Sequence, residues 1–222
     1  MHYFPLTAPF LLALLFLVGL VIVLVEIGVL EYAYEKIGIG RQYVFAILLL
    51  SFFGSYINIP VAALAEERVE SHQVVNWFGV RYVIPMVREE PGTIIAVNLG
   101  GAVIPTVLSI YLLFKTRMYV RALATVAIVT VIVHLLAQPV RGVGIAVPTL
   151  VPPLVAAISA LLVAPRSAAP VAYIAGSLGT LLGADVLNLS RISGLGAPIA
   201  SIGGAGTFDG IFVSGILAVL LA

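Results

Sequence analysis

Residues 119–137 read YVRALATVAIVTVIVHLLA, and this stretch decides the fold class. A helix that crosses the hydrocarbon core of a membrane needs about 20 apolar residues, because each residue rises about 1.5 Å and the core is about 30 Å thick. The stretch meets this length, with Arg121 near its start and His134 near its end. It therefore predicts a transmembrane helix.

The composition of the whole chain agrees with a membrane protein. Of its 222 residues, 62% are hydrophobic and 9% are charged, and the mean hydropathy is +1.19. An ordinary soluble domain is about half apolar and about one quarter charged. The chain therefore lacks the polar residues to cover a globule in water, which excludes a secreted, nucleic-acid-binding or soluble cytosolic protein. With no cysteine and a net charge of +1, it implies neither a thiolate metal site nor a polyanionic partner.

The same length criterion predicts seven spans: 6–25, 43–65, 93–114, 119–137, 148–164, 169–189 and about 203–222. The apolar runs are too long for barrel strands, which would alternate over about 10 residues. Pro148, Pro152 and Pro153 predict a kinked or partly unwound fifth span. We predict an all-α polytopic bundle of about seven helices, some broken at Gly or Pro, forming a single domain over 1–222 in the cell membrane.

The one sizeable extramembrane segment is predicted at 66–92, which begins and ends with charged residues. Between them, aromatic and β-branched residues surround Gly79, a pattern typical of a short hairpin. An interfacial segment anchored by Trp77 and Tyr82 fits the same residues. The loops on the two sides of the membrane carry five and six basic residues, which leaves the orientation open. The compact cluster of Lys115, Arg117 and Arg121 favours the cytoplasm for its side.

Asp185 and Asp209, the only aspartates of the chain, both lie in apolar segments close to glycines. A charged side chain at this depth costs at least about 2.5–3.5 kcal/mol, so such residues usually face a partner or a polar cavity. By the rise of a helix, Asp185 lies about 6 Å before the exit of the sixth span. Asp209 lies about 9 Å past the entry of the seventh, at the same face. Consecutive antiparallel helices are normally neighbours, so we expect the two carboxyls at matching height on adjoining helices.

Two carboxyls in a low-dielectric site cannot both ionise cheaply, and they can share a proton and activate a water molecule. The same pair can bind a cation or relay protons. Asn188 is predicted on the helix face of Asp185. Six glycines between 193 and 210 favour a re-entrant stretch, in which Gly204, Gly206 and Gly210 would let an extended substrate backbone approach closely.

Small residues recur in two places. Gly100-Gly101-Ala102 opens the third predicted span and Gly203-Gly204-Ala205 opens the seventh. Either this reflects packing of small residues between helices, or a two-helix unit is duplicated, which would favour a transporter-like symmetry.

Several segments resemble an uncharacterised prokaryotic membrane-protein family, domain of unknown function 1614. They are Asn98 to Ala102, Pro139 to Gly144, Pro152-Pro153, Gly183 to Asn188 and Gly203 to Gly210. The resemblance covers most of the chain and implies a membrane protein without implying an activity.

Residues 170–217 also distantly resemble the intramembrane aspartyl proteases of the presenilin and signal-peptide-peptidase type. Those enzymes carry one aspartate in their sixth span and one in a Gly-x-Gly-Asp motif in their seventh. Asp185 and Asp209 fall in the corresponding spans, with Gly204-Ala205-Gly206 ahead of Asp209. Thr207 and Phe208 interrupt the motif, and Ala184 stands where that family has tyrosine. The resemblance implies a catalytic pair, Asp185 and Asp209.

We therefore expect an intramembrane aspartyl-protease-like protein that hydrolyses membrane-embedded peptides. A small cation- or proton-coupled transporter or channel, with the same aspartates as its ion site, is the first alternative, and a non-catalytic membrane scaffold is the second. The expected partners are the lipid bilayer and a peptide substrate, with no nucleic acid, cofactor or metal. The sequence specifies no oligomeric state.

Overall fold

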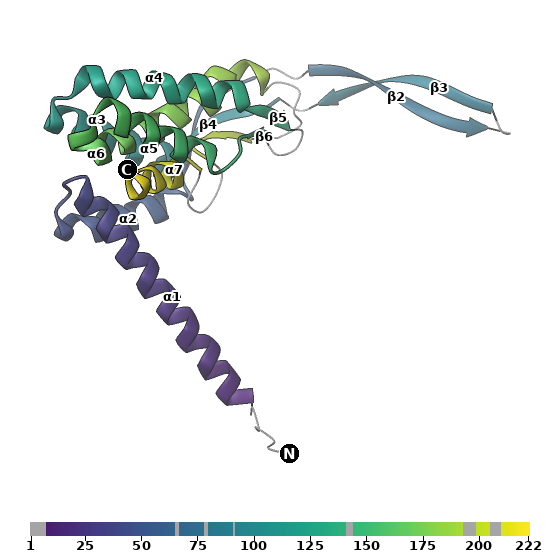
Figure 1. The fold of residues 1–222 in the computed structure, drawn as a ribbon. Helices are drawn as coiled ribbons and strands as arrows, with labels where there is room; N and C mark the ends of the chain where they lie inside the picture. The colour runs from purple at the N-terminus through teal and green to yellow at the C-terminus, as the bar shows by residue number, and fades with distance from the viewer. Residues whose placement is uncertain are drawn as a thin grey trace.

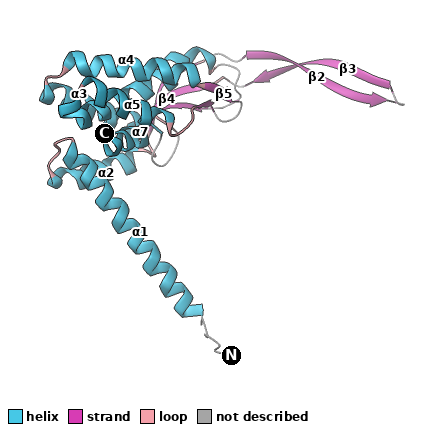
Figure 2. Cartoon of the chain, viewed as in Figure 1, coloured by secondary structure: helices cyan, strands magenta, loops and turns pink. Residues whose placement is uncertain are grey.

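The structure is a computed structural model that describes residues 8–222 except 65–66, 78–79, 91, 141–143, 193–198 and 205–209. Most of it is helical, and strands lie at one end of a helix bundle (Figures 1 and 2). The helices are α1 (Ala8–Lys36), α2 (Arg41–Gly54), α3 (Ile104–Thr116), α4 (Tyr119–Leu136), α5 (Val151–Val163), α6 (Ala168–Ile174) and α7 (Gly210–Leu221). The strands are β1 (Asn58–Ala63), β2 (Glu67–Trp77), β3 (Val80–Glu90), β4 (Ile94–Asn98), β5 (Gln138–Val140), β6 (Gly144–Ala146) and β7 (Ile199–Ile202).

Short π-helical and 3-10 turns extend two of the helices. The π-helical turn η1 (Leu99–Val103) leads into α3. The 3-10 turn η2 (Pro165–Ser167) precedes α6, which continues through the π-helical turns η3 (Ala175–Gly179) and η4 (Leu181–Asp185) and the 3-10 turn η5 (Val186–Arg191). As a result, Pro165–Arg191 is one long apolar helix of changing pitch.

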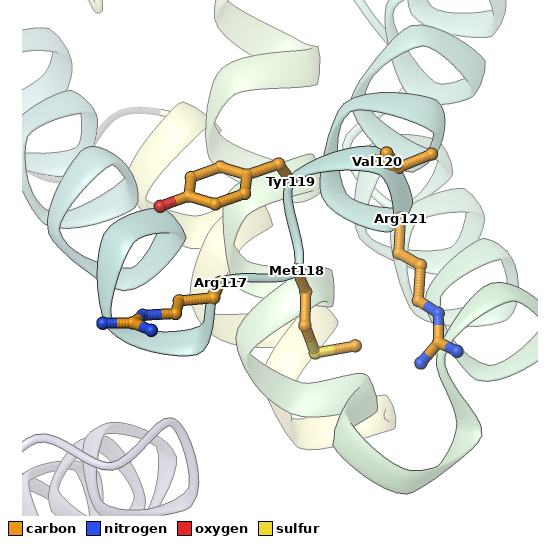
Figure 3. A pocket seen from close by; sticks show the side chains of 5 residues that line it. All are labelled: Arg117, Met118, Tyr119, Val120 and Arg121. Atoms are coloured by element: carbon orange, nitrogen blue, oxygen red, sulfur yellow. The ribbon is translucent and has the colours of Figure 1, made fainter.

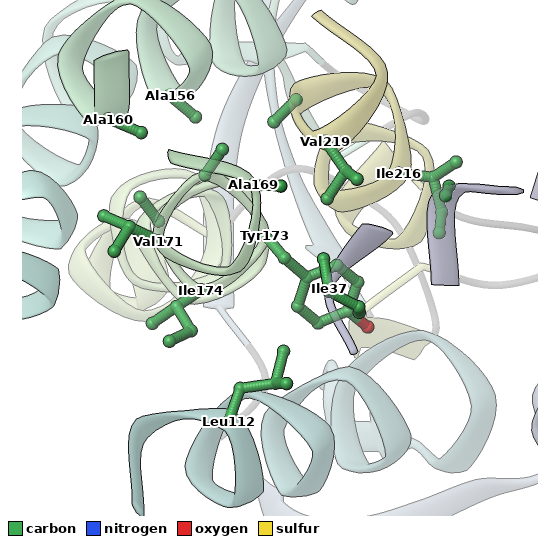
Figure 4. Close-up of a cluster of buried hydrophobic side chains, with 14 of the residues drawn as sticks. Ile37, Leu112, Ala156, Ala160, Ala169, Val171, Tyr173, Ile174, Ile216 and Val219 are labelled. Atoms are coloured by element: carbon green, nitrogen blue, oxygen red, sulfur yellow. The ribbon is translucent and has the colours of Figure 1, made fainter. Parts of the chain in front are cut away.

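This long helix is the centre of the bundle. Its α6 segment contacts α3, α4, α5 and α7. In its most apolar window 61% of the residues are buried, against 28% in α4. Figure 4 shows the surrounding core, in which Ile174 of α6 points toward Leu112 of α3 and Tyr173 lies on the side of α6 nearer to Val219 of α7. Burial of these side chains and of many alanines holds the bundle together by close packing.

Glycines bring the long helix close to α4. A Cβ atom at Gly179 would lie 2.6 Å from Cβ of Val129, and one at Gly183 would lie 2.6 Å from the carbonyl oxygen of Thr130. Both distances are far below van der Waals contact, so only glycine fits at this crossing. The crossing packs η4, whose last residue is Asp185, against α4.

The N-terminal helices meet in a sharp bend. The segments Glu26–Lys36 and Arg41–Gly54 are inclined by 117°, with Gly38 at φ +86° in the turn between them. The Lys115 ammonium donates a hydrogen bond to the Gly38 carbonyl, and Lys36 Nζ donates one to the Val219 carbonyl over 3.1 Å. The bend is therefore tied to the ends of α3 and α7, while the beginning of α1 points away from the bundle (Figure 1).

A three-stranded sheet and two hairpins complete the fold. In the sheet, β4 is the middle strand, antiparallel to β1 and parallel to β7. Strands β2 and β3 pair over their full length, from Glu67 with Glu90 to Trp77 with Val80, and project away from the bundle (Figure 1). Most of the predicted segment 66–92 lies in this hairpin. Strands β5 and β6 form a short second hairpin between α4 and α5.

The apolar helices support a membrane protein. By length and composition, three helices of the described chain are long and apolar enough to cross a membrane: Leu99–Thr116, Tyr119–Leu136 and Pro165–Arg191. The bent pair formed by α1 and α2 would make a fourth if it counts as one span. Helices α5 and α7 have 13 and 12 residues, fewer than the roughly 20 that a span needs.

The all-α expectation is wrong for two of the predicted spans. The predicted span 43–65 is helical only to Gly54 and then forms β1, and the span 93–114 begins as β4. In the span 203–222 the described helix is Gly210–Leu221, and residues 205–209 lie outside the described chain. The strands of the spans 43–65 and 93–114 are as apolar as helices but short, rich in isoleucine and valine, and bounded by asparagine, proline or glycine. Hydropathy alone does not separate such strands from helices.

Candidate functional site

Asp185 is anchored at the end of the long helix, in η4. Its side chain is half-buried, and its Oδ2 atom accepts a hydrogen bond of 2.8 Å from the backbone N–H of Gly203. Gly203 follows β7 directly and is buried, with φ at +84°. A Cβ atom there would lie 2.6 Å from Cβ of Ala102, so glycine is required both for the turn and for the contact with η1. The turn thus brings a backbone donor to the carboxylate.

Asp185 also lines a pocket of about 260 Å³ between the long helix, α7 and the segment from β6 to α5. Three hydroxyl residues, Thr149, Thr180 and Ser214, share this pocket with the carboxylate. Thr180 Oγ1 is buried and has no hydrogen-bond partner among the described residues. Such an atom normally bonds to a water molecule or a ligand. The remaining lining residues are Ile145, Ala146, Val147, Pro152, Ala184, Gly210 and Ile211.

The second aspartate, Asp209, lies outside the described residues, as does Gly206. Its neighbour Gly210 is the first residue of α7 and lines the same pocket as Asp185. Gly210 is exposed, and a Cβ atom there would meet no atom of the described residues within 4 Å. The pocket therefore joins the Asp185 carboxylate to the start of the helix that follows Asp209.

Two further predicted site residues form hydrogen bonds within the protein. Asn188 is fully buried, and its Nδ2 atom donates to the carbonyl oxygens of Gly183 and Ala184 at 2.8 and 3.0 Å. These carbonyls lie where the π-helical turn η4 gives way to the 3-10 turn η5, and Asn188 does not line the pocket. Gly204 belongs to the turn after β7, where its N–H donates to the Ser201 carbonyl over 3.2 Å.

An amide network centred on the buried Asn98 lies on the other side of the turn at Gly203. The Nδ2 atom of Asn98 donates to the Ser55 carbonyl at 2.7 Å and to Asn58 Oδ1 at 3.0 Å, while its Oδ1 accepts from Gly101 N–H at 2.8 Å. Ser201 Oγ lies 2.6 Å from Asn58 Oδ1 and 2.6 Å from the Gly204 carbonyl. The network links β1, β4 and β7 and supports the turn that holds Asp185.

The two Gly-Gly-Ala segments belong to similar, adjacent units. Strand β4 precedes Gly100-Gly101-Ala102 and α3, and strand β7 precedes Gly203-Gly204-Ala205 and α7. The two strands pair in parallel, Ile94 with Ile199 through Val97 with Ile202, and α3 contacts α7. The repeated sequence therefore corresponds to neighbouring strand-and-helix units that run in the same direction.

In the described part of the chain, His, Asp and Glu side chains do not gather in any group of three or more that could hold a metal ion.

The fold and the site define a mostly helical membrane protein with a half-buried carboxylate held beside a glycine turn. The chain belongs to the family described as "Protein of unknown function (DUF1614)", whose model matches residues 52–221. The match includes the sheet, the long helix and α7, and it confirms the family resemblance seen in the sequence. No curated protein and no solved structure matches the chain.

We expect the hydrogen bond between Asp185 and Gly203 to contribute to stability. Asp185→Ala leaves the buried Gly203 N–H without this acceptor, which should lower the free energy of unfolding by about 1–3 kcal/mol. Asp185→Asn keeps an oxygen in the same place and should cost less than about 1 kcal/mol. Chemical denaturation of the detergent-solubilised variants measures both values. Equal losses for the two variants would contradict a role for this bond.

Proposed function

We propose that this protein is an intramembrane aspartyl-protease-like enzyme of the cell membrane, with Asp185 and Asp209 as its catalytic pair. The observation that carries the proposal is the pocket shared by Asp185 and Gly210, the residue after Asp209. The distant resemblance to presenilin-type proteases supports the same pair. In this proposal the shorter helices α5 and α7 and the bent pair α1 and α2 complete a multi-pass bundle of about seven membrane segments.

The chemistry requires one protonated and one ionised carboxyl. The ionised carboxylate takes a proton from a water molecule, whose oxygen attacks the carbonyl carbon of the peptide bond. The protonated carboxyl gives its proton to the carbonyl oxygen. On collapse of the tetrahedral adduct the C–N bond breaks, the leaving amine takes the proton that the first carboxyl removed from water, and a hydroxyl of the adduct returns a proton to the second carboxylate as the carbonyl group of the product forms. The Gly203 N–H at 2.8 Å would hold the Asp185 carboxylate in position without supplying a proton to it.

The pocket offers features that suit an extended substrate. None of the described residues fills the space beside Gly210, which would leave room for a peptide backbone in the pocket that Asp185 lines. The unpartnered Thr180 hydroxyl and Ser214 offer hydrogen bonds to a substrate or to the attacking water. In this proposal Gly204, Gly206 and Gly210 keep the substrate path free of side chains, and Asn188 acts indirectly, by holding the end of the helix that carries Asp185.

Proteoliposomes that contain model transmembrane peptides test the proposal. We expect the wild-type protein to release cleaved peptide and both Asp185→Asn and Asp209→Asn to release none, as measured by mass spectrometry. Leu187→Ala, an exposed position on the same helix outside the pocket, serves as the control and should cleave like the wild type. Equal cleavage by wild type and both aspartate variants, or cleavage by none of the four proteins, would reject the protease.

A small ion- or proton-coupled transporter is the second candidate, and the parallel arrangement of the two strand-and-helix units favours it. Parallel repeats around an axis along the membrane normal occur in secondary transporters. In that case Asp185 would bind or carry the transported cation. Flux of protons or Na⁺ measured on the same vesicles should then fall in Asp185→Asn but not in Leu187→Ala. If neither cleavage nor flux is observed, the remaining alternative is a non-catalytic membrane scaffold.

A further inference from the structure

The end of the bundle opposite the sheet is rich in positive charge. It contains the turns between α1 and α2, α3 and α4, and α5 and α6, which alternate with connections at the other end. Six of the eleven lysines and arginines of the chain lie at these turns: Lys36, Arg41, Lys115, Arg117, Arg121 and Arg166. The acidic residues close to them are Glu31 and Glu35 of α1. The hairpin of β2 and β3 carries three arginines and four glutamates within its strands, so the excess of basic residues is confined to one end.

Half of these basic residues are already used within the protein. Arg41 pairs with Glu31 at 2.8 Å, and Lys36 and Lys115 donate to backbone carbonyls. The other three basic residues at these turns, Arg117, Arg121 and Arg166, are exposed. Within the chain that the structure describes, none of these three guanidinium groups has a hydrogen-bond or ion-pair partner. Three guanidinium groups at one end are therefore available to an external anion.

Two of them line a pocket at the turn between α3 and α4. The pocket has a volume of about 270 Å³ and is formed by Arg117, Met118, Tyr119, Val120 and Arg121 (Figure 3). The two arginines extend on either side of Met118, and Val120 is 82% exposed. Apolar side chains beside exposed cations and a tyrosine are the arrangement expected at the boundary between acyl chains and headgroups.

The backbone of Arg117 provides an independent observation. Arg117 ends α3 in the left-handed conformation, with φ 53° and ψ 25°. Among the described residues it is the one non-glycine residue with positive φ. Glycine or asparagine normally occupies this position at the end of a helix, because other side chains are strained there. An arginine at this position therefore costs stability, and contact of its guanidinium with a ligand would offset that cost.

We propose that Arg117, Arg121 and Arg166 bind the phosphate groups of anionic lipids, and that this end of the bundle faces the cytoplasmic leaflet. The turn between α3 and α4 joins two helices of membrane-spanning length, so its cations lie at the depth of the headgroups. The cytoplasmic leaflet carries the negative surface potential that attracts such clusters. This proposal does not depend on the protease, because the arginines lie at the opposite end of the bundle from Asp185.

Lipid titration followed by native mass spectrometry tests the proposal on the full chain. Each basic residue near an anionic surface strengthens binding roughly fivefold, so Arg117→Gln, Arg121→Gln and Arg166→Gln together should weaken binding of phosphatidylglycerol by on the order of 100-fold. Binding of phosphatidylcholine should not change. Arg191→Gln, an exposed arginine at the other end, is the control and should bind like the wild type. Unchanged phosphatidylglycerol binding in the triple variant, or an equal loss in the control, would overturn the proposal.

The single variant Arg117→Gly separates lipid binding from folding. Because glycine is unstrained at this backbone conformation, the variant should melt at the same temperature as the wild type or higher. Its affinity for phosphatidylglycerol should fall about fivefold. A lower melting temperature together with unchanged lipid affinity would contradict the proposal. Stabilisation of the wild type by inorganic phosphate as strong as that by phosphatidylglycerol would show that the site takes a free anion and would reject the lipid.

Discussion

Gly100→Ala is expected to prevent the protein from folding. A Cβ atom at Gly100 would lie 2.1 Å from the carbonyl oxygen of Ser51 and 2.4 Å from the backbone nitrogen of Ser55. Both atoms belong to the backbone at the end of α2, so no change of side-chain rotamer relieves the overlap. Extra methyl groups among mobile side chains cost about 1–3 kcal/mol. We expect a larger loss here, because η1 and α2 must separate and the Asn98 network lies directly beside their contact.

The measurement is the yield of monodisperse protein after extraction and its melting temperature by size-exclusion chromatography. Gly28→Ala in α1 is the control, because a Cβ atom there meets nothing within 4 Å. Alanine is the better helix former by about 1 kcal/mol, so this variant should be as stable as the wild type or more stable. A Gly100→Ala protein that melts at the wild-type temperature would contradict the close contact between α2 and η1.

Asn98→Ala is expected to lower the free energy of unfolding by at least about 3 kcal/mol. The Asn98 side chain is completely buried and makes three hydrogen bonds, to the Ser55 carbonyl, to Asn58 Oδ1 and from the Gly101 N–H. Alanine leaves buried polar groups without their partners, and each such group costs about 1–3 kcal/mol. It also removes the side chain that caps the helical segment beginning at η1.

Asn58→Ala provides the matched comparison, since it makes the same substitution at the other amide of the network. Asn58 is exposed, so in its absence water can accept the hydrogen bonds that Asn98 and Ser201 donate to its Oδ1 atom. We expect this variant to lose less than half as much stability as Asn98→Ala. Chemical denaturation of both proteins in the same detergent gives the comparison. Equal losses of stability in the two variants would mean that burial of the Asn98 side chain does not decide how much the network stabilises the protein.

The long helices could be predicted from the sequence because length and hydropathy are sufficient for them. The predicted span 119–137 corresponds to α4, and 169–189 lies within Pro165–Arg191. The sheet could not be predicted in the same way, because its strands lie inside apolar runs and pair with residues far away in the chain. Asn58 and Ser201 meet across 143 residues, and nothing in either local sequence identifies the partner.

The candidate site was predicted in part. The sequence identified Asp185 and the glycine-rich stretch that provides its hydrogen-bond donor, Gly203. It placed Asn188 on the face of Asp185 by assuming a regular helix. In the structure the Asn188 amide instead turns back to the carbonyl oxygens of Gly183 and Ala184, and the spacing of Asp185 and Asn188 along the chain does not predict these local hydrogen bonds. Thr180 gave no signal, because single hydroxyl residues are common in membrane helices and usually bond to their own backbone.

The parallel pairing of β4 with β7 has a consequence for biogenesis. Ile94 of β4 pairs with Ile199 of β7, so one edge of β4 stays unpaired until most of the chain has been synthesised. Contacts so distant along the chain form late, because closing a long loop costs entropy before the contact repays it. The antiparallel hydrogen bonds of β1 with β4 need only the early part of the chain and can form during translation. The Gly203 amide reaches Asp185 only once β7 has docked, so this carboxylate acquires its final surroundings at the end of assembly.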